Sequence, residues 1–152
     1  MEGDESMTLD PNTIRFRLDL ILDYLNELRP LATLTLDEFL SDRYKTRAAE
    51  RVLEITLQAA LDINNHLLKE QFKVVRKSNS DGFLELRKFN VLPSQLAQDM
   101  HESGGFRNRL AHHYYAVDPE IVFQIIFEAL NQYPKYIQQI ENFLDSLEEN
   151  NE

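Results

Sequence analysis

The spacing of apolar residues constrains this chain more than any other feature of its sequence. Apolar side chains recur every three or four residues over most of its length, which places them along one face of an α-helix. No segment shows the strict alternation that is typical of a half-buried strand. Only four glycines and five prolines interrupt the 152 residues. The sequence therefore predicts an all-α fold, a helical bundle of four to five main helices.

Capping residues and prolines predict where the first helices begin and end. Asp10 can cap a helix that carries Pro11 in its first turn and ends or kinks at Pro30. Thr35 and Glu38 have the spacing of a capping box, which predicts a short helix through about Leu40. A long helix is expected over 42–72. The inward faces should hold Ile14, Leu18, Ile21, Leu22, Leu25 and Leu28 in the first helix, and Tyr44, Ala48, Val52, Ile55, Ala59, Ile63 and Leu67 in the long one.

The second half of the chain predicts shorter elements and then another long helix. Residues 78–82 form a turn, 83–89 a short helix, and Pro93 opens a helix that can bend at 104–105 and continues to about His112. Asp118 and Pro119 start the last helix, which Pro134 should kink and which ends near Leu147. Its inward face should hold Ile121, Ile125, Leu130, Tyr133, Ile137, Ile140 and Leu144. One helical domain is expected over 10–147, between a disordered tail at 1–9 and a polar tail at 148–152.

Composition argues against several classes of protein. Without cysteine the chain has neither disulfides nor thiolate metal sites. No apolar run approaches the ~20 residues of a membrane span, and the acidic first ten residues do not resemble a signal peptide. We therefore expect a cytoplasmic protein with no membrane contact. Phosphate loops, zinc-binding histidine motifs and nucleophile elbows are also missing, so we expect no metal and no cofactor.

The charge is unevenly distributed along the chain. Residues 43–109 hold twelve Lys/Arg and eight Asp/Glu, a balance of +4, whereas the rest holds four and eighteen, a balance of −14. One interpretation is a positive face for a polyanion on a protein whose net charge is −10. The other is a solvated helix surface, and charge alone leaves both open.

In the segment 106–115, eight of the ten residues are polar or aromatic. Asn108 and His112 are four residues apart and share a helix face, and Arg107 borders it about 100° away. His112 is expected near the end of its helix, where the helix dipole favours imidazolium. A histidine can transfer a proton to or from a ribose hydroxyl, and an arginine can stabilise the charge of a five-coordinate phosphorus. Residue types alone also fit a surface helix end with solvated Arg107 and Arg109.

The same segment resembles a known family of ribonucleases. Arg107-x4-His112 is similar to the R-x(4–6)-H motif of HEPN ribonucleases, and Tyr114 completes the R-x4-H-x-Y form of HepT toxins. Those toxins are paired with minimal nucleotidyltransferase antitoxins of the MntA type. Asn108 occupies the polar position that usually follows the motif arginine, and residues 48–66 look like the family's long second helix. The resemblance covers roughly residues 10–145.

The resemblance implies a fold, an activity and a mode of control. It implies a homodimer in which the motif helices of two subunits line one cleft, and metal-independent cleavage of RNA by 2′-hydroxyl attack on the adjacent phosphate. Arg107 would bind the phosphate, His112 would act as general acid and base, and Asn108 would orient them. Tyr114 would accept AMP from the antitoxin, as in type II/VII-like HEPN/MNT toxin–antitoxin systems, and the added anions would repel RNA.

Four alternatives remain open within this interpretation. His113 and Tyr115 offer a shifted register, because Arg107 to His113 also satisfies the broader motif. His113 and Arg109 are possible second-shell residues, and so are Asp62, Asn65 and His66, which also fit a plain polar helix end. The competing functions are a non-catalytic HEPN module that binds nucleotide or RNA or scaffolds a nucleotidyltransferase, and a simple helical dimerisation protein.

Overall fold

Helices make up most of the described part of the chain. The computed structural model describes residues 9–74, 81–102 and 118–150, and these contain no strand. The elements are α2 (Pro11–Leu28), the 3₁₀ turn η1 (Arg29–Thr33), α3 (Leu36–Leu40), α4 (Arg43–His66), the π-helical turn η2 (Leu67–Gln71), α5 (Asp81–Lys88), a helix over 94–102 and α7 (Pro119–Asn150). The predicted all-α fold is therefore confirmed.

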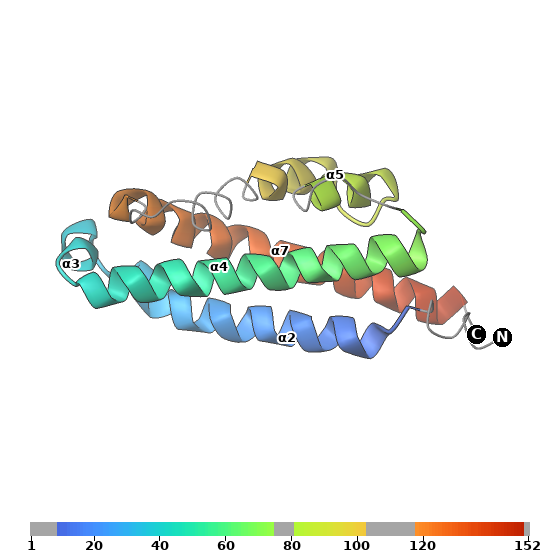
Figure 1. The fold of residues 1–152 in the computed structure, drawn as a ribbon, viewed down its shortest axis with the longest axis horizontal. Helices are drawn as coiled ribbons and strands as arrows, with labels where there is room; N and C mark the ends of the chain where they lie inside the picture. Colours follow the sequence, from blue (N-terminus) through green and yellow to red (C-terminus); the bar gives the residue numbers. More distant parts are fainter. Residues whose placement is uncertain (1–8, 75–80, 103–117, 151–152) are drawn as a thin grey trace.

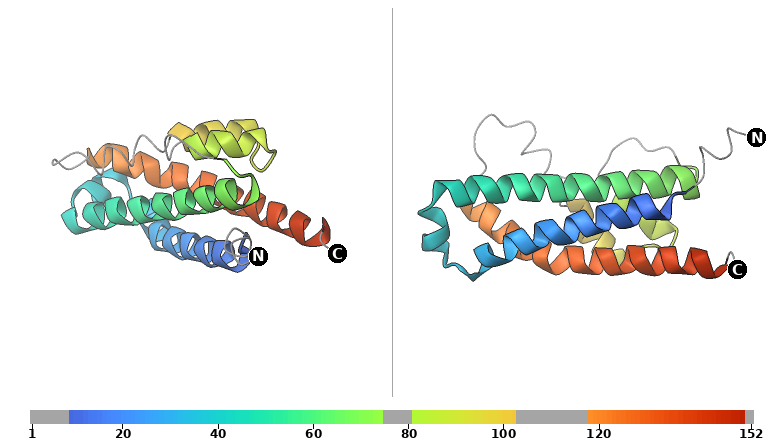
Figure 2. Two further views of the ribbon diagram at one scale, coloured as in Figure 1. Left: turned by 45° about the vertical axis from the view of Figure 1, so that its right-hand side comes forward. Right: turned by 90° about the horizontal axis from the view of Figure 1, so that it is seen from below.

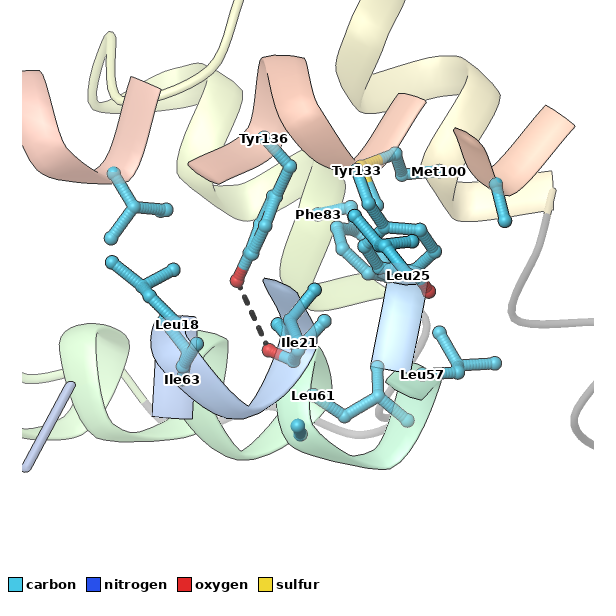
Figure 3. Close-up of a cluster of buried hydrophobic side chains, with 14 of the residues drawn as sticks. Leu18, Ile21, Leu25, Leu57, Leu61, Ile63, Phe83, Met100, Tyr133 and Tyr136 are labelled. Atoms are coloured by element: carbon cyan, nitrogen blue, oxygen red, sulfur yellow. Dashed lines mark hydrogen bonds between the residues drawn. The ribbon is translucent and has the colours of Figure 1, made fainter. Parts of the chain in front are cut away.

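Three long helices form the body of the bundle. Helices α2, α4 and α7 contact one another, and α2 runs antiparallel to the other two (Figure 1). The short helix α3 closes one end, while α5 and the helix over 94–102 lie together across one side (Figures 1 and 2). The core where they meet combines Leu18, Ile21 and Leu25 of α2 with Leu57, Leu61 and Ile63 of α4, Phe83 of α5, Met100, and Tyr133 and Tyr136 of α7 (Figure 3).

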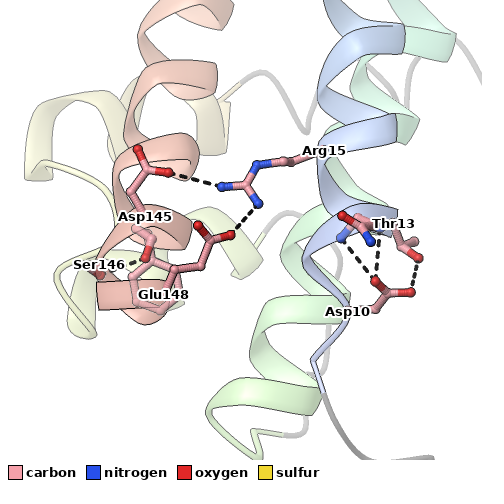
Figure 4. Close-up of polar contacts among 8 residues, drawn as sticks. Asp10, Thr13, Arg15, Asp145, Ser146 and Glu148 are labelled. Carbon is pink, nitrogen blue, oxygen red and sulfur yellow. Dashed lines mark hydrogen bonds and ion pairs between the residues drawn. The ribbon is translucent and has the colours of Figure 1, made fainter. Parts of the chain in front are cut away.

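Short-range signals placed the starts of α2 and α3 correctly. Asp10 Oδ1 accepts the backbone N–H groups of Asn12 and Thr13 at the start of α2 (Figure 4). Thr35 and Glu38 form both hydrogen bonds of the expected capping box. Such contacts involve residues two or three apart, so sequence alone can predict them.

Helix α5 ends in a Schellman motif that uses asparagine. Asn90 has φ 62°, its N–H donates to the Arg87 carbonyl, and the Val91 N–H donates to the Leu86 carbonyl. Val91 and Leu86 are both buried, which supplies the apolar contact of this motif. Pro93 then prevents the helix from continuing, and the next helix begins at Ser94.

The predicted inward faces were correct for most of α2 and wrong in parts of α4 and α7. Leu22 is 45% exposed, Tyr44 is 86% exposed and Ala48 is exposed. Helix α4 instead buries Thr46, Ala49, Leu53, Thr56, Leu57, Ala60 and Leu61. In α7 the buried residues are Val122, Ile126, Ala129, Tyr133, Tyr136, Ile140 and Leu144, so the first part of the face is rotated by one residue from the prediction.

The two ends of the helical domain differ slightly from the expected limits. Leu9 packs against the core, and α7 continues through Pro134 to Asn150, three residues beyond the expected end. Near this end, Arg15 of α2 pairs with Asp145 at 3.1 Å and with Glu148 at 2.8 Å (Figure 4). Asp81, expected in a turn, begins α5, while the remaining expected tail at 1–8, the bend at 104–105 and most of the 78–82 turn lie outside the described residues.

Candidate active site and its helical frame

The motif residues lie outside the part of the chain that the structure describes. Arg107, Asn108, Arg109, His112, His113, Tyr114 and Tyr115 all fall within 103–117. The structure does describe the helices on both sides of this segment, and these define how the motif is attached to the bundle.

The helix over 94–102 leads into the motif from a firmly packed position. Leu96, Ala97 and Met100 are buried on one face of it, with exposures of 7%, 0% and 0%. Met100 lies beside Tyr133 of α7 and Phe83 of α5 (Figure 3). The chain therefore enters the motif segment from a helix docked on the core.

The chain leaves the motif segment at a capped helix start. Asp118 accepts the Glu120 backbone N–H at 2.9 Å, which caps α7 as the sequence predicted. Val122 is fully buried in the first turn, and Phe123 packs on Phe39 of α3 with ring centroids 5.0 Å apart. Residue 118 therefore lies at the α3 end of the bundle.

Asp62 and His66 are two of the possible second-shell residues. Asp62 contacts a side chain of its own helix, α4, and His66 contacts the start of α2. Asp62 accepts from the Gln58 amide at 2.9 Å. His66 Nε2 accepts the backbone N–H of Asp10 at 3.1 Å, so the imidazole ties the end of α4 to the start of α2. The pKa of Asp10 is lowered chiefly by hydrogen bonds from Thr13.

Asn65 differs, because its side-chain oxygen is buried without a hydrogen-bond partner among the described residues. Its neighbour Asn64 is fully buried and accepts a hydrogen bond from the Tyr136 hydroxyl at 2.6 Å. Burial raises the pKa of Tyr136 well above its ordinary value, so the hydroxyl stays protonated and acts as a donor. Asn64 and Tyr136 lie 72 residues apart, so local sequence patterns do not reveal them as a buried polar pair.

A groove of about 260 Å³ lies between α2 and α4. Its lining combines the apolar Leu20, Tyr24, Ile55 and Ala59 with the polar or charged Arg17, Arg51, Glu54, Gln58 and Asp62. Arg51 pairs with Glu54 at 3.4 Å, so two of the charges offset each other. Within the described ranges, no three histidine, aspartate or glutamate side chains converge as a metal site, and no helix has the length and hydropathy of a membrane span.

The fold is an all-helical bundle, and the motif segment joins the helix over 94–102 to α7. Together they define a protein of the HEPN type. Residues 21–140 match the model of a family described as ribonuclease HepT-like, a stretch that includes the whole motif segment. The chain is also 40% identical over 144 residues to a protein named tRNA nuclease HepT from Aphanizomenon flos-aquae, an alignment that covers 95% of this chain and 98% of the relative. The chain belongs to the HepT-like ribonuclease family, which confirms the resemblance inferred from the motif.

Solved structures share the fold at low sequence identity. A tri-AMPylated HEPN toxin of Shewanella oneidensis in complex with MNT antitoxin superposes with a TM-score of 0.78 at 20% identity, covering 88% of this chain and 99% of that one. The cytosolic protein of unknown function YutE from Bacillus subtilis superposes with a TM-score of 0.80 at 14% identity, covering 91% and 92%.

Proposed function

We propose that this protein is the toxin of a HEPN/MNT toxin–antitoxin system, a cytoplasmic, metal-independent endoribonuclease. The observation that carries the proposal is the arrangement Arg107-x4-His112-x-Tyr114 inside the stretch that matches the HepT-like family. A relative of 40% identity is named a tRNA nuclease, which makes transfer RNA the first substrate to test.

The proposed chemistry needs only ribose, phosphate and protein side chains. The 2′-hydroxyl attacks the adjacent phosphorus while His112 takes its proton, and the bond to the 5′-oxygen breaks as a proton is returned to that oxygen. The products are a 2′,3′-cyclic phosphate and a 5′-hydroxyl. Arg107 stabilises the extra charge on the five-coordinate phosphorus, and Asn108 orients the reacting groups.

A homodimer supplies the second proton-transfer group. General base and general acid act on opposite sides of the phosphorus, and one histidine cannot occupy both positions at once. Two copies of His112 across a two-fold axis would provide both. His113 is the alternative base in the shifted register, and Arg109 is a candidate second-shell residue.

Control is assigned to Tyr114 and a nucleotidyltransferase partner. Each AMP attached to the Tyr114 hydroxyl adds a bulky anion beside the cleft, which would exclude RNA by volume and by charge repulsion. The solved tri-AMPylated HEPN toxin bound to MNT antitoxin supports this form of control.

The test of the activity compares two adjacent histidines. We expect purified protein to cleave transfer RNA in the presence of EDTA, His112→Ala to lose at least about 100-fold in rate, as removal of a general acid–base group does, and His113→Ala to stay near the wild-type rate. Equal cleavage by His112→Ala and wild type would contradict the catalytic assignment and favour a non-catalytic HEPN module. Loss of cleavage in His113→Ala alone would show that His113 is the catalytic histidine, as in the shifted register.

A separate test addresses Tyr114. Co-expression with the neighbouring nucleotidyltransferase should add whole AMP units to the intact mass, and these should disappear in Tyr114→Phe but persist in Tyr115→Phe. AMP retained in Tyr114→Phe would refute this assignment. Light scattering at micromolar concentration checks the dimer, and a stable monomer would contradict the composite site.

A further inference from the structure

The first two turns of α4 present an exposed row of arginines beside an exposed tyrosine. We call Arg43, Tyr44, Arg47 and Arg51 the α4 basic stripe. All three arginines are exposed, with the Arg51 side chain at 68%, and Tyr44 is 86% exposed. Residues 43–51 hold four basic residues and one acidic residue, in a chain whose net charge is −10.

The arginines follow one another at a regular interval. Each is four residues from the next, which corresponds to about 6 Å along the axis and about 40° around it. Tyr44 lies within about 60° of Arg47 and Arg51 on the same surface. The interval is close to the distance between successive phosphates in an extended single strand of RNA.

The stripe is not accounted for by contacts within the described chain. No ion pair joins Arg43 or Arg47 to an acidic residue among the described ranges, and Arg51 has only Glu54. Like charges four residues apart destabilise a helix, so the two arginine pairs weaken α4 rather than support it. Glu50, the one acid inside the stripe, is half-buried, and its pKa is raised by burial and lowered to a smaller extent by the charge of Arg47.

We propose that the α4 basic stripe binds the backbone of a single-stranded segment of the RNA substrate, with Tyr44 stacking on a base. The inference rests on the proposed ribonuclease function and adds a substrate-binding surface outside the motif. An arginine row beside an aromatic platform is the combination that proteins use for single strands. The acidic surface of the remaining chain repels RNA, so binding needs a local positive surface such as this one.

The test measures binding separately from cleavage. Anisotropy of a short fluorescein-labelled, fully 2′-O-methylated RNA single strand is titrated with wild type and Arg43→Gln/Arg47→Gln at several salt concentrations. The 2′-O-methyl groups remove the nucleophile, so the probe is not cut. We expect weaker binding and a slope of log affinity against log salt that is smaller by about 1.4, since each phosphate contact to a single strand contributes about 0.7.

Two matched variants serve as controls. Arg29→Gln/Lys135→Gln removes the same charge from exposed positions on η1 and α7 and should bind like wild type. Tyr44→Ala should weaken binding about five-fold or more, whereas Tyr44→Phe, which keeps the stacking face, should not. Circular dichroism should show unchanged folding for every variant, because all these side chains are exposed.

The outcomes separate this inference from the proposed activity. The proposed RNA binding is overturned if Arg43→Gln/Arg47→Gln binds the probe like wild type, or if Arg29→Gln/Lys135→Gln loses as much affinity. Either result counts even if wild type cleaves RNA and His112→Ala does not. Stripe-dependent binding without any cleavage supports the stripe and contradicts the catalytic proposal. A further outcome is that stripe variants bind RNA normally but no longer bind the nucleotidyltransferase, or have a changed oligomeric state. Either result would identify the α4 basic stripe as a protein interface and overturn the proposed RNA binding.

Discussion

The buried pair of Tyr136 and Asn64 gives a sharp test of how α7 is held against α4. Both side chains are fully buried, and the hydroxyl donates to Asn64 Oδ1 at 2.6 Å. Asn64 Nδ2 already lacks a partner among the described residues. Tyr136→Phe would therefore leave the whole carboxamide unpaired, and a buried group without a partner costs about 1–3 kcal/mol.

Substitution of Asn64 should destabilise the protein less than substitution of Tyr136. In Asn64→Leu the tyrosine hydroxyl keeps an acceptor, because the Ala60 carbonyl oxygen lies 3.1 Å away. The double variant Tyr136→Phe/Asn64→Leu removes both polar groups and should return to within about 1 kcal/mol of wild type, since replacing both partners by apolar groups can be nearly neutral. The two substitutions should thus be strongly non-additive.

Urea denaturation followed by far-UV circular dichroism measures this cycle. Protein concentration must be the same for all four proteins, because a dimer's stability depends on it. We expect Tyr136→Phe to lower the midpoint at unchanged m-value, and a loss of about 2 kcal/mol corresponds to about 4–8 °C in Tm for a chain of this size. A loss below about 0.5 kcal/mol in Tyr136→Phe, or a double variant as unstable as the sum of the singles, would refute the unpaired-amide reasoning.

Three further predictions test packing, a helix end and a cap. Phe39 is fully buried, so Phe39→Ala should lower the free energy of unfolding by about 3–5 kcal/mol, whereas Phe16→Ala, at a 64% exposed position, should change it by less than about 0.5 kcal/mol; equal effects in urea melts would contradict the assigned burial. Asn90→Gly should be neutral or stabilising at φ 62°, while Asn90→Val should lower stability by about 1–2 kcal/mol; a Val variant as stable as wild type would exclude the left-handed conformation. The pKa of Asp10 is lowered from 3.8 by its hydrogen bonds with Thr13, so its capping contribution is present above pH 3.8 and is lost as pH falls through the folded pKa. The stability difference between wild type and Asp10→Ala should shrink accordingly in melts below pH 3.8, and a difference that grows there would have the wrong sign.

The sequence determined the features that depend on neighbouring residues. Helical periodicity excluded a sheet, and the caps at Asp10, Thr35 and Asp118 lie where their side chains can reach nearby backbone N–H groups. Family membership was also readable in advance, because the spacing of Arg107, His112 and Tyr114 is a property of the linear chain.

Only the tertiary structure decided which face of α4, and of the first part of α7, is buried. Helix α4 packs against α2 and against α7, so its apolar surface is wider than one stripe, and a stripe drawn through Tyr44 and Ala48 was compatible with the spacing. The observed packing buries Ala49 and Leu53 instead and leaves Tyr44 exposed. That rotation depends on contacts between residues far apart in the chain, which local periodicity does not encode, and it places the aromatic side chain on the surface where the α4 basic stripe lies.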